Sequence, residues 1–314
     1  SQVYFLDQGK SLGDDFNQFK TDTDLSNKLA SDEVMQETFE SSVSAIYDKI
    51  KGFSVRETKN SGIITLPDKI YITETIEFDE EQESFYNQIQ EELIVEVQKH
   101  GEVLLDDSSA IVKRLLRLVQ VASNPVLVDE RYIGRSAKEE RLDELIHEIM
   151  EKNEKCIVWS SFIDNINYFT KKYKSLGSVK IHGKMSIAER NRSVEKFRSD
   201  DSRILFATPA SAKEGLTLTM ANHVIFYDRG FSLDDYLQAQ DRIHRISQTK
   251  ICYVHNMVIT GSIDEWVDAL LTAKQNAAFL AQGDITLGQY KQTADYSFGD
   301  LIKAILFPNN SEIY

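Results

Sequence analysis

Two arginines with a regular spacing are the side chains in this sequence best suited to bind an anion. Arg242 and Arg245 lie in SLDDYLQAQDRIHRISQ, residues 232–248, and with Gln238 they fall at positions i, i+4 and i+7. This spacing predicts one face of a helix. A planar guanidinium donates two parallel hydrogen bonds to phosphate or carboxylate oxygens, yet no acidic residue shares that face. The alternative is a solvated face on which Asp241 pairs with Arg245, a contact worth about 0.3–0.5 kcal/mol.

A helix must position these arginines, and its start is marked in the sequence. Ser232 and Asp235 have the spacing of a capping box, which predicts a helix that begins at Leu233. Apolar residues then recur at intervals of 3, 4 and 3 and predict a buried stripe. The stripe comprises Tyr236, Ala239, Ile243 and Ile246. The arginines are therefore expected at the rim of a core.

Apolar runs rich in β-branched residues recur around this helix. They are residues 155–161, 178–183, 202–208, 223–228 and 251–259. Helical patterns at 163–173 and 187–197 lie between them, and this alternation predicts an α/β domain with a parallel sheet. The N-terminal part differs, because it shows amphipathic helices. These are expected at 32–51, 80–99 and 108–123, with one strand at 69–78.

Composition limits the classes of protein that fit. The 314 residues are 41% hydrophobic and 27% charged, which is typical of a soluble globular protein with about two domains. We find no run of about 18 apolar residues and no secretory signal, so we expect a cytoplasmic protein, nucleoid-associated in a bacterium, with no membrane partner. Cys156 and Cys252 are expected to be buried filler, and the histidines lack the spacing of a zinc site.

The acidic net charge of −14 is unevenly distributed along the chain. Residues 141–250 hold 18 Lys+Arg against 15 Asp+Glu, whereas the segments on either side are acidic. Because exposed charges act over about 10 Å, this middle segment could face a polyanion. The acidic N-terminal helices could instead dock another protein.

Residues 207–248 carry a family resemblance. ATPASAKEGLTLTMANHVIFYDRGFSLDDYLQAQDRIHRISQ resembles motifs V and VI of the second RecA-like lobe of superfamily-two helicases, closest to the Swi/Snf family of DNA-dependent ATPases. The closing pattern Q-A-x-D-R-x-H-R-I-x-Q is matched by Gln238, Ala239, Asp241, Arg242, His244, Arg245, Ile246 and Gln248. Upstream, CIVWSSF is similar to motif IV. Gly183, Arg190 and Phe197 resemble the family's series of a glycine, an arginine and a phenylalanine. The likeness extends through VRETKNSGIITLPDKIY, similar to the linker between lobes, to VYFLDQGKSLGDDFNQF, similar to the end of the first lobe.

The resemblance implies an α/β fold with a RecA-like parallel sheet flanked by helices. A helical insertion and linker region would precede the sheet and a short helical extension would follow it. The implied division is the end of the first lobe with a helical insertion at 1–60, a linker strand with a helical region at 61–139, the second lobe at 140–275, and the extension at 276–314.

The resemblance also implies roles for individual residues. Arg242 and Arg245 would be catalytic arginine fingers that reach ATP across a cleft, and Gly215 and Gln238 would join them in nucleotide binding. Hydroxyls and cations at the ends of parallel strands would follow a DNA phosphate backbone. These DNA-binding candidates are Ser160, Ser161, Thr208 and Lys213.

The implied function is that of the C-terminal half of an ATP-driven translocase on double-stranded DNA. The nucleotide ATP and its Mg²⁺ would be held mainly by the first lobe, which is the second expected partner. Two alternatives stay open: the lobe of a helicase that unwinds RNA or DNA, and a non-catalytic module that binds nucleic acid or protein.

Two short segments mimic the missing phosphate and metal sites. QGKS at 8–11 lacks the glycine that a phosphate-binding loop needs, since Tyr4 occupies its position. DEEQ at 79–82 opens an amphipathic helix, where acids are favoured without any metal. We therefore predict that this chain alone has no appreciable ATPase activity.

The sequence departs from the family pattern at a few positions. Ala212 and Lys213 stand where glycines are usual in motif V, Phe231 replaces a tryptophan, and Glu57 replaces the second arginine of the linker.

Overall fold

The computed structural model describes residues 10–24, 33–53, 66–100, 108–199 and 201–293, without the side chains of 96–100, 108–114 and 212–214. Most of the expected linker, with Glu57, lies outside the described residues, as do Tyr4 and the last part of the expected extension. The chain divides into two compact units. One comprises residues 59–267, and the other comprises residues 1–58 together with 268–314.

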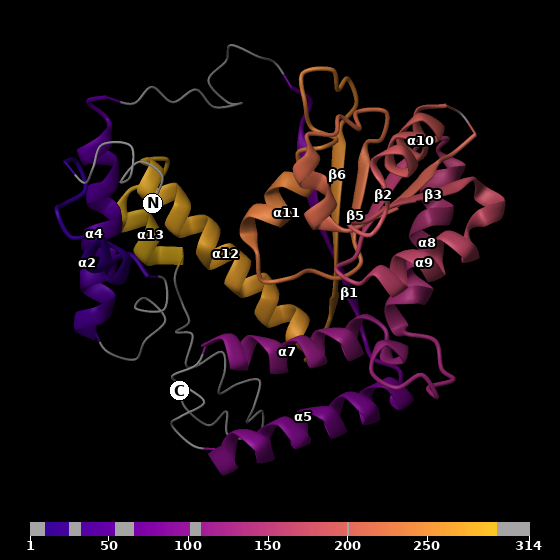
Figure 1. Cartoon of the computed structure of the whole chain (residues 1–314), viewed down its shortest axis with the longest axis horizontal. Coiled ribbons are helices and arrows are strands. Elements are labelled where there is room, and N and C mark those ends of the chain that lie inside the picture. The colour runs from indigo at the N-terminus through magenta and orange to yellow at the C-terminus, as the bar shows by residue number, and fades with distance from the viewer. Residues whose placement is uncertain (1–9, 25–32, 54–65, 101–107, 200, 294–314) are drawn as a thin grey trace. The chain divides into compact units, whose positions relative to one another are not determined.

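A six-stranded parallel sheet forms the centre of the unit 59–267 (Figure 1). Its strands lie in the order β1-β6-β5-β2-β4-β3. They are β1 (Lys69–Ile76), β2 (Cys156–Trp159), β3 (Ser178–Ile181), β4 (Ile204–Ala207), β5 (His223–Phe226) and β6 (Cys252–Ile259). The inner strands β2, β4 and β5 are buried at every residue, as expected for a sheet covered on both faces. The predicted parallel sheet is confirmed, and the strand expected at 69–78 forms its edge beside β6.

Helices cover both faces of this sheet. Phe169, on α9 (Ile163–Lys172), stacks on Phe206 of β4 with ring centroids 5.8 Å apart. Tyr236, on α11 (Leu233–Gln240), packs on Phe226 of β5 at 4.7 Å. Phe226 is in register with Ala207, the neighbour of Phe206, so the two aromatic contacts lie on opposite faces. Figure 1 shows α11 on one side of the strands and α8 (Ala137–Glu151) with α9 on the other.

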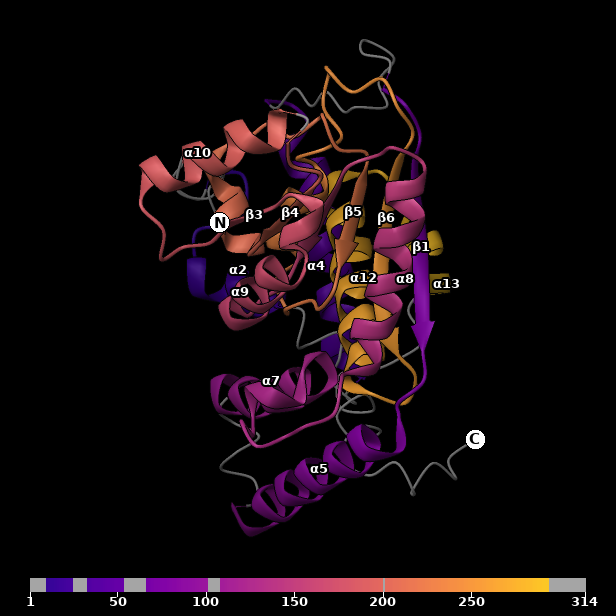
Figure 2. The same ribbon diagram turned by 90° about the vertical axis from the view of Figure 1, so that its right-hand side faces the viewer.

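The remaining helices of this unit lie before the sheet or in its connections (Figure 2). They are α5 (Glu80–His100), α7 (Ser108–Ser123), η1 (Pro125–Leu127), η2 (Lys174–Leu176), α10 (Ile187–Arg198) and η3 (Pro209–Glu214). As predicted, α7 ends just before Pro125, which cannot continue a helix. Both cysteines are buried, as expected. No helix in the described part of the chain has the length and apolar character needed to cross a bilayer.

The other unit is helical. It contains α2 (Phe16–Asp22), α4 (Glu33–Ile50), the residues of α12 (Ile263–Gln282) after Val267, and α13 (Leu287–Thr293). Phe39 and Val43 of α4 form a buried core with Leu280 and Tyr290. Glu40 of the same helix forms an ion pair with Lys291, with Oε2 and Nζ 3.1 Å apart. Segments from the two ends of the chain therefore share one apolar cluster.

The helix that carries the arginine motif is shorter than its sequence predicts. It begins as expected, since the Ser232 hydroxyl accepts a hydrogen bond from the Asp235 N–H at 3.3 Å. It ends at Gln240, and residues 241–247 form turns and bends. The prediction of one helical face carrying Gln238, Arg242 and Arg245 was therefore wrong. Ile246 is 75% exposed instead of buried, whereas the other three members of the predicted stripe are buried.

Candidate functional site

Residues 241–248, here named the arginine turn, hold Arg242 in a buried position. Its side chain is 5% exposed. Nη1 donates to the backbone oxygen of Leu216 at 3.4 Å, while Nε is buried without a hydrogen-bond partner. A buried donor without an acceptor is costly, typically about 1–3 kcal/mol, unless a ligand supplies the acceptor. This guanidinium therefore has hydrogen-bonding capacity that the protein does not use.

Arg245 is half-buried and lies against the loop that follows η3. Its Nε donates to the backbone oxygen of Asp241 at 3.2 Å, and Nη1 donates to Gly215 O at 3.2 Å and to Thr217 Oγ1 at 3.0 Å. Gly215 has a φ of 74°, a left-handed conformation that favours glycine. All the oxygens that hold Arg245 are uncharged. Its positive charge is therefore positioned but not neutralised by them.

The charges around the two arginines favour an incoming anion. Burial lowers the pKa of Arg242, and the neighbouring Arg245 cation lowers it further, against a smaller opposite effect of Asp241. In the described part of the chain, no ion pair joins either arginine to a carboxylate. Asp241 instead pairs with Lys69 of β1, with Nζ and Oδ1 3.0 Å apart. The alternative in which Asp241 pairs with Arg245 was wrong. Gln238 is exposed on α11, one turn before the arginine turn.

Gln248 explains why the chain leaves the helix after Gln240. Its buried Nε2 donates to the backbone oxygens of Thr219, Ala221 and Ile243 at 3.2, 2.9 and 2.9 Å. Its Oε1 accepts from the N–H groups of the next two residues at 3.0 and 2.9 Å. One amide thus ties the arginine turn to the loop before β5, and continuation of the helix would break this set of hydrogen bonds.

The strand-end serines predicted to contact DNA differ sharply. Ser160, directly after β2, is fully buried, and its Oγ donates to Asp228 Oδ2 at 2.5 Å. Ser161 is exposed, and its N–H donates to Asp228 Oδ1 at 2.7 Å. Asp228 also accepts from Ser123 at 2.9 Å. Sequence reasoning missed Asp228, although an acid that ends a buried strand is an unusual signal. Ser160 therefore helps to hold the strand ends together and is not accessible to a phosphate.

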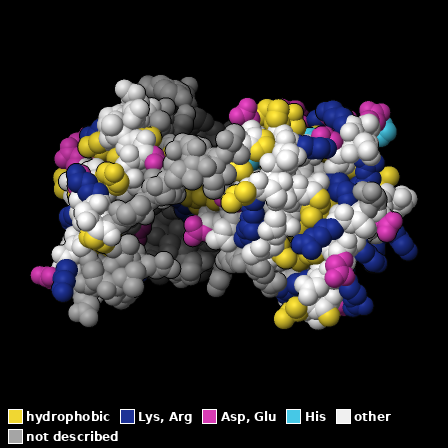
Figure 3. Space-filling model, turned by 90° about the horizontal axis from the view of Figure 1, so that it is seen from above, with side chains coloured by type: hydrophobic (Ala, Val, Ile, Leu, Met, Phe, Trp, Pro, Cys, Tyr) yellow, Lys and Arg dark blue, Asp and Glu magenta, His cyan; other side chains and the backbone are white. Residues whose placement is uncertain are grey.

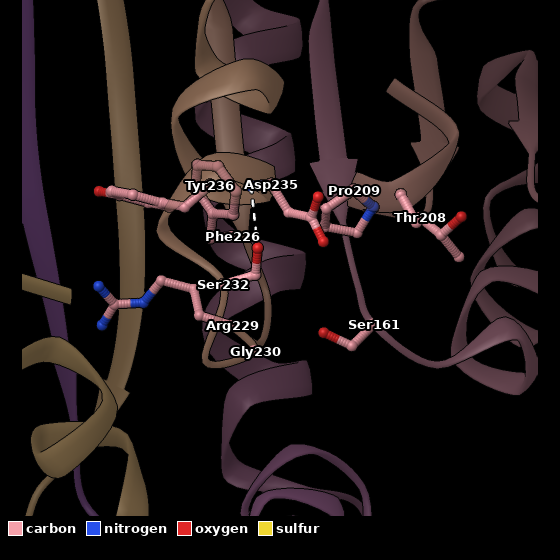
Figure 4. A pocket seen from close by; sticks show the side chains of 10 residues that line it. Ser161, Thr208, Pro209, Phe226, Arg229, Gly230, Ser232, Asp235 and Tyr236 are labelled. Carbon is pink, nitrogen blue, oxygen red and sulfur yellow. Dashed lines mark hydrogen bonds between the residues drawn. The ribbon is translucent and has the colours of Figure 1, made fainter. Parts of the chain in front are cut away.

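Ser161 and Thr208 line one cavity of about 130 Å³ at the carboxyl ends of β2, β4 and β5 (Figure 4). The Asp235 carboxylate also lines it, and in Figure 4 the Ser161 hydroxyl points toward the same space, whereas the Thr208 hydroxyl points away from Asp235. Arg229, another lining residue, directs its guanidinium to the opposite side. The side chain of Lys213 lies outside the described part of the structure, although its backbone belongs to η3.

The predicted nucleotide and DNA candidates lie at opposite ends of the sheet. The arginine turn precedes β6 and the Gly215 loop precedes β5, so both lie toward the amino ends of these strands. Ser161 and Thr208 follow β2 and β4 and lie at the carboxyl ends. α11 joins the two places, because Asp235 and Tyr236 near its start line the cavity. The eight residues of α11 span about 12 Å.

The described residues offer no metal site built from three or more His, Cys, Asp or Glu side chains. At the DEEQ segment, Asp79 caps α5 by accepting a hydrogen bond from the Gln82 N–H at 2.8 Å. The cap interpretation is confirmed there. Seen from above in Figure 3, Lys and Arg side chains gather over the right-hand part of the molecule, which holds α9 and α10 in Figure 1. Exposed cations of this region include Lys171, Lys184, Arg192 and Lys196.

Sequence comparison places Arg242 and Arg245 inside a known domain. Residues 137–247 match the family model described as the helicase conserved C-terminal domain. The putative ATP-dependent helicase/translocase YwqA of Bacillus subtilis is 33% identical over 248 residues, which are 75% of this chain and 26% of that protein. An uncharacterized ATP-dependent helicase of Mycoplasma pneumoniae is 28% identical over 252 residues, 79% of this chain and 24% of that protein. The chain thus spans about a quarter of the length of these curated relatives.

Solved structures agree with this match. The SWI2/SNF2 ATPase core domain of Sulfolobus solfataricus superposes with a TM-score of 0.60 at 25% identity, over 97% of this chain and 60% of that one. The same ATPase core in complex with double-stranded DNA gives a TM-score of 0.58 at 25% identity, over 92% of this chain and 62% of that one. The C-terminal part of the Fun30 ATPase domain, at 18% identity and a TM-score of 0.58, shares the fold.

Proposed function

Because the chain belongs to the SNF2-like helicases and contains their C-terminal RecA-like lobe, we propose that it completes the ATPase site of a translocase that moves along double-stranded DNA. In this proposal Arg242 and Arg245 donate hydrogen bonds to phosphoryl oxygens of ATP bound on a separate lobe. The observation that carries it is the buried, partnerless Nε of Arg242 beside Arg245, whose own contacts are uncharged oxygens.

The chemistry of the arginines fits this task. Transfer of the γ-phosphoryl group spreads negative charge over its oxygens, and a fixed guanidinium stabilises that charge without reorganisation. Arg242 is held by burial and Arg245 by the Gly215 and Thr217 oxygens, so both are already positioned. Gly215 acts through its carbonyl oxygen, and Gln238 is exposed close by. Mg²⁺ would be held by the other lobe, since the described residues offer no metal cluster.

Contact with DNA would use the opposite end of the sheet. The exposed Ser161 is suited to the DNA phosphate backbone, and Thr208, whose side chain is buried, lines the same cavity with Lys213 five residues later in the sequence. The Asp235 carboxylate lines the same cavity, so a phosphate would contact its rim and not enter it. A related ATPase core has been solved with double-stranded DNA, which supports duplex DNA over an unwound strand as the partner.

The test is ATP hydrolysis by the full-length protein that contains this chain, measured with and without duplex DNA. We expect Arg242→Ala and Arg245→Ala to lower the stimulated kcat by about 10³-fold, as for other arginine fingers. Arg131→Ala is the matched control, because that side chain is 89% exposed and pairs with Asp129. Turnover within about threefold of wild type in both arginine variants would refute the proposal, since a finger contributes about 10³-fold. The isolated 314-residue chain is expected to show no DNA-stimulated turnover.

A further inference from the structure

An exposed apolar side chain lies in the arginine turn itself. Ile246, which the sequence pattern predicts in a buried stripe, is 75% exposed, whereas Arg242 of the same turn is 5% exposed. Single exposed apolar residues are common on protein surfaces, so exposure alone does not indicate a contact site. The position of Ile246 in the turn distinguishes it from other exposed apolar residues.

Ile246 lies at the tip of a tight turn that begins with Arg245. The N–H of Gln248 donates to the Arg245 carbonyl oxygen at 2.8 Å, so Ile246 and Ser247 are the two central residues of the turn. Glycine, proline, asparagine, aspartate and serine are favoured at such positions. An exposed isoleucine gains neither the conformational freedom of glycine nor burial there. The conformation of the turn therefore does not account for this residue type.

The chain is fixed on both sides of Ile246. Arg245 is held by hydrogen bonds to three oxygens. The hydroxyls of Ser247 and Thr219 share a hydrogen bond of 2.7 Å, and the Gln248 amide ties the next residue to the loop before β5. The β-branched side chain of Ile246 is thus carried on an ordered support. An apolar group that is already ordered loses little entropy when a partner covers it.

The proposed function determines which partner would cover this side chain. If ATP on a separate lobe is within hydrogen-bond distance of Arg245, that lobe also comes close to the next residue, whose Cα is about 3.8 Å away. Ser247, Thr249 and Lys250 are exposed polar residues that follow Ile246. An apolar centre with a polar rim is the usual arrangement of a protein–protein interface. The phosphate backbone of DNA offers no apolar surface, which favours protein as the partner.

We propose that Ile246 is a contact residue for the ATP-bearing lobe and packs against an apolar surface of that lobe when the two lobes close on ATP. This inference rests on the proposed function of Arg242 and Arg245. Ile246 would stabilise the closed state with bound ATP and in the transition state alike, because its side chain offers the phosphate no hydrogen bond. Loss of the contact should therefore raise KM for ATP more than it lowers kcat.

The first experiment measures lobe closure in the full-length protein by energy transfer between dyes on the two lobes, in a titration with the β,γ-imido analogue of ATP and duplex DNA present. Ile246→Ser should raise the analogue concentration at half-closure about tenfold, since a buried apolar contact is lost. Ile246→Val keeps most of the apolar surface and should stay within about threefold of wild type. Ile133→Ser is the matched control, because Ile133 is 93% exposed and precedes α8; it should leave closure unchanged.

The second experiment identifies the partner. Ile246→p-benzoylphenylalanine should cross-link to the ATP-bearing lobe when the analogue is bound and not without it. Cross-links to DNA or to a second copy of the protein overturn the inference, as does closure of Ile246→Ser at the wild-type concentration. A lower melting temperature of nucleotide-free Ile246→Ser also overturns it, since the side chain would then stabilise the turn itself. If Arg245→Ala retains wild-type turnover, the proposed function fails instead, whatever the closure of Ile246→Ser.

Discussion

Two polar clusters meet the edge strand β1 on opposite faces of the sheet, and they differ in whether their charged side chains have counter-charges within the cluster. On one face, the arginine turn holds two cations against uncharged oxygens. On the other, Glu74, His255, His223 and Glu154 form a continuous chain, here named the histidine cluster. Its contacts are Glu74 Oε1 to His255 Nδ1 at 2.8 Å, His255 Nε2 to His223 Nδ1 at 3.2 Å, and His223 Nε2 to Glu154 Oε2 at 2.7 Å.

The histidine cluster is closed by its own carboxylates. The hydrogen bond from His255 lowers the pKa of Glu74 despite its burial. Burial alone would raise the pKa of Glu154, but the hydrogen bond from His223 helps to lower it overall. Arg141 also pairs with Glu74, at 3.0 Å. Since every end of this chain meets a charged partner, the cluster is suited to holding β1, β6 and β5 together.

The difference distinguishes the structural role that we infer for the charges of the histidine cluster from the functional role that we propose for those of the arginine turn. Both clusters are buried or half-buried and both contain aligned donors, so burial alone does not distinguish them. A cluster with internal counter-charges gains nothing from an anionic ligand, whereas the arginine turn still lacks one. A substitution that gives the arginine turn an internal counter-charge should therefore lower activity, whereas a substitution that removes a counter-charge from the histidine cluster should lower stability.

The largest effect should come from closing the arginine turn with an internal acid. Thr217 Oγ1 accepts from Arg245 Nη1 at 3.0 Å, so Thr217→Asp would place a carboxylate against that guanidinium. We expect duplex-stimulated kcat of the full-length protein to fall about 100-fold, approaching the loss from removing a finger. The melting temperature should stay the same or rise, since a new ion pair is formed.

Thr217→Asn is the matched control for that substitution, because it has the same size without the charge. It should keep kcat within about threefold of wild type, since the hydrogen bond to Arg245 can be retained. Equal losses in the Asp and Asn variants would mean that shape and not charge matters at Thr217, and the contrast between the two clusters would lose its meaning.

The second effect comes from opening the histidine cluster. Glu74→Gln keeps the shape but removes the charge that meets His255 and Arg141. We expect the free energy of unfolding in urea to fall by about 2 kcal/mol, since hydrogen bonds to charged groups contribute about 1.5–3 kcal/mol. Turnover per folded molecule should not change. Glu77→Gln, at an exposed position just beyond the same strand, should leave both quantities unaltered.

The third effect is a pH dependence of stability that belongs to the histidine cluster. Burial first, and then the His255 charge, lower the pKa of His223 from 6.5 to about 4, against the Glu154 hydrogen bond. Between these two values the unfolded chain binds a proton that the folded chain does not, so stability falls as pH falls. The lowered pKa values of Glu74 and Glu154 act in the same direction at lower pH, below their ordinary value.

Urea unfolding at pH 7 and pH 4.5 measures this dependence. We expect wild type to lose about 2 kcal/mol more than His223→Gln over this interval, because each unit of pKa shift corresponds to about 1.36 kcal/mol. The charged groups around His223 are His255, Glu154, Lys152, Glu74, Arg141 and Lys250. If the variant loses as much stability as wild type, His223 is not the group that binds the proton.

The two clusters also show which features the sequence can predict. Continuous apolar runs predict the strands of the sheet, and the Ser232 cap predicts the start of α11, because these signals are local. The end of α11 is not determined locally: it depends on the Gln248 amide and on contacts from Lys69 and Pro67, which lie 172 and 177 residues before their partners in the chain. The sequence spacing therefore predicted a helix that includes both arginines, although the helix stops before Arg242.

The smallest effect separates two adjacent serines that the sequence could not distinguish. Ser160 donates to the buried Asp228, whereas Ser161 lines the cavity at the strand ends. Ser161→Ala should weaken duplex-DNA binding by the full-length protein by about threefold at low salt, because one neutral hydrogen bond contributes about 0.5–1.5 kcal/mol. Ser160→Ala should leave DNA affinity unchanged and lower the free energy of unfolding by about 1–3 kcal/mol, since Asp228 would lose a buried donor.

Affinity should be measured by fluorescence anisotropy across a salt series. Both variants should keep the wild-type slope of affinity against salt, because a hydroxyl releases no counterion whereas a lysine or arginine contact does. The salt slope thus tests whether a charged contact is lost, and the comparison of the two serines tests whether the hydroxyl is accessible to DNA. If Ser160→Ala weakens DNA binding more than Ser161→Ala in fully folded protein, the buried hydroxyl must become exposed when DNA binds. The hydrogen bonds around Asp228 would then describe one conformation of a site that changes when DNA binds. In that respect the site would differ from the histidine cluster.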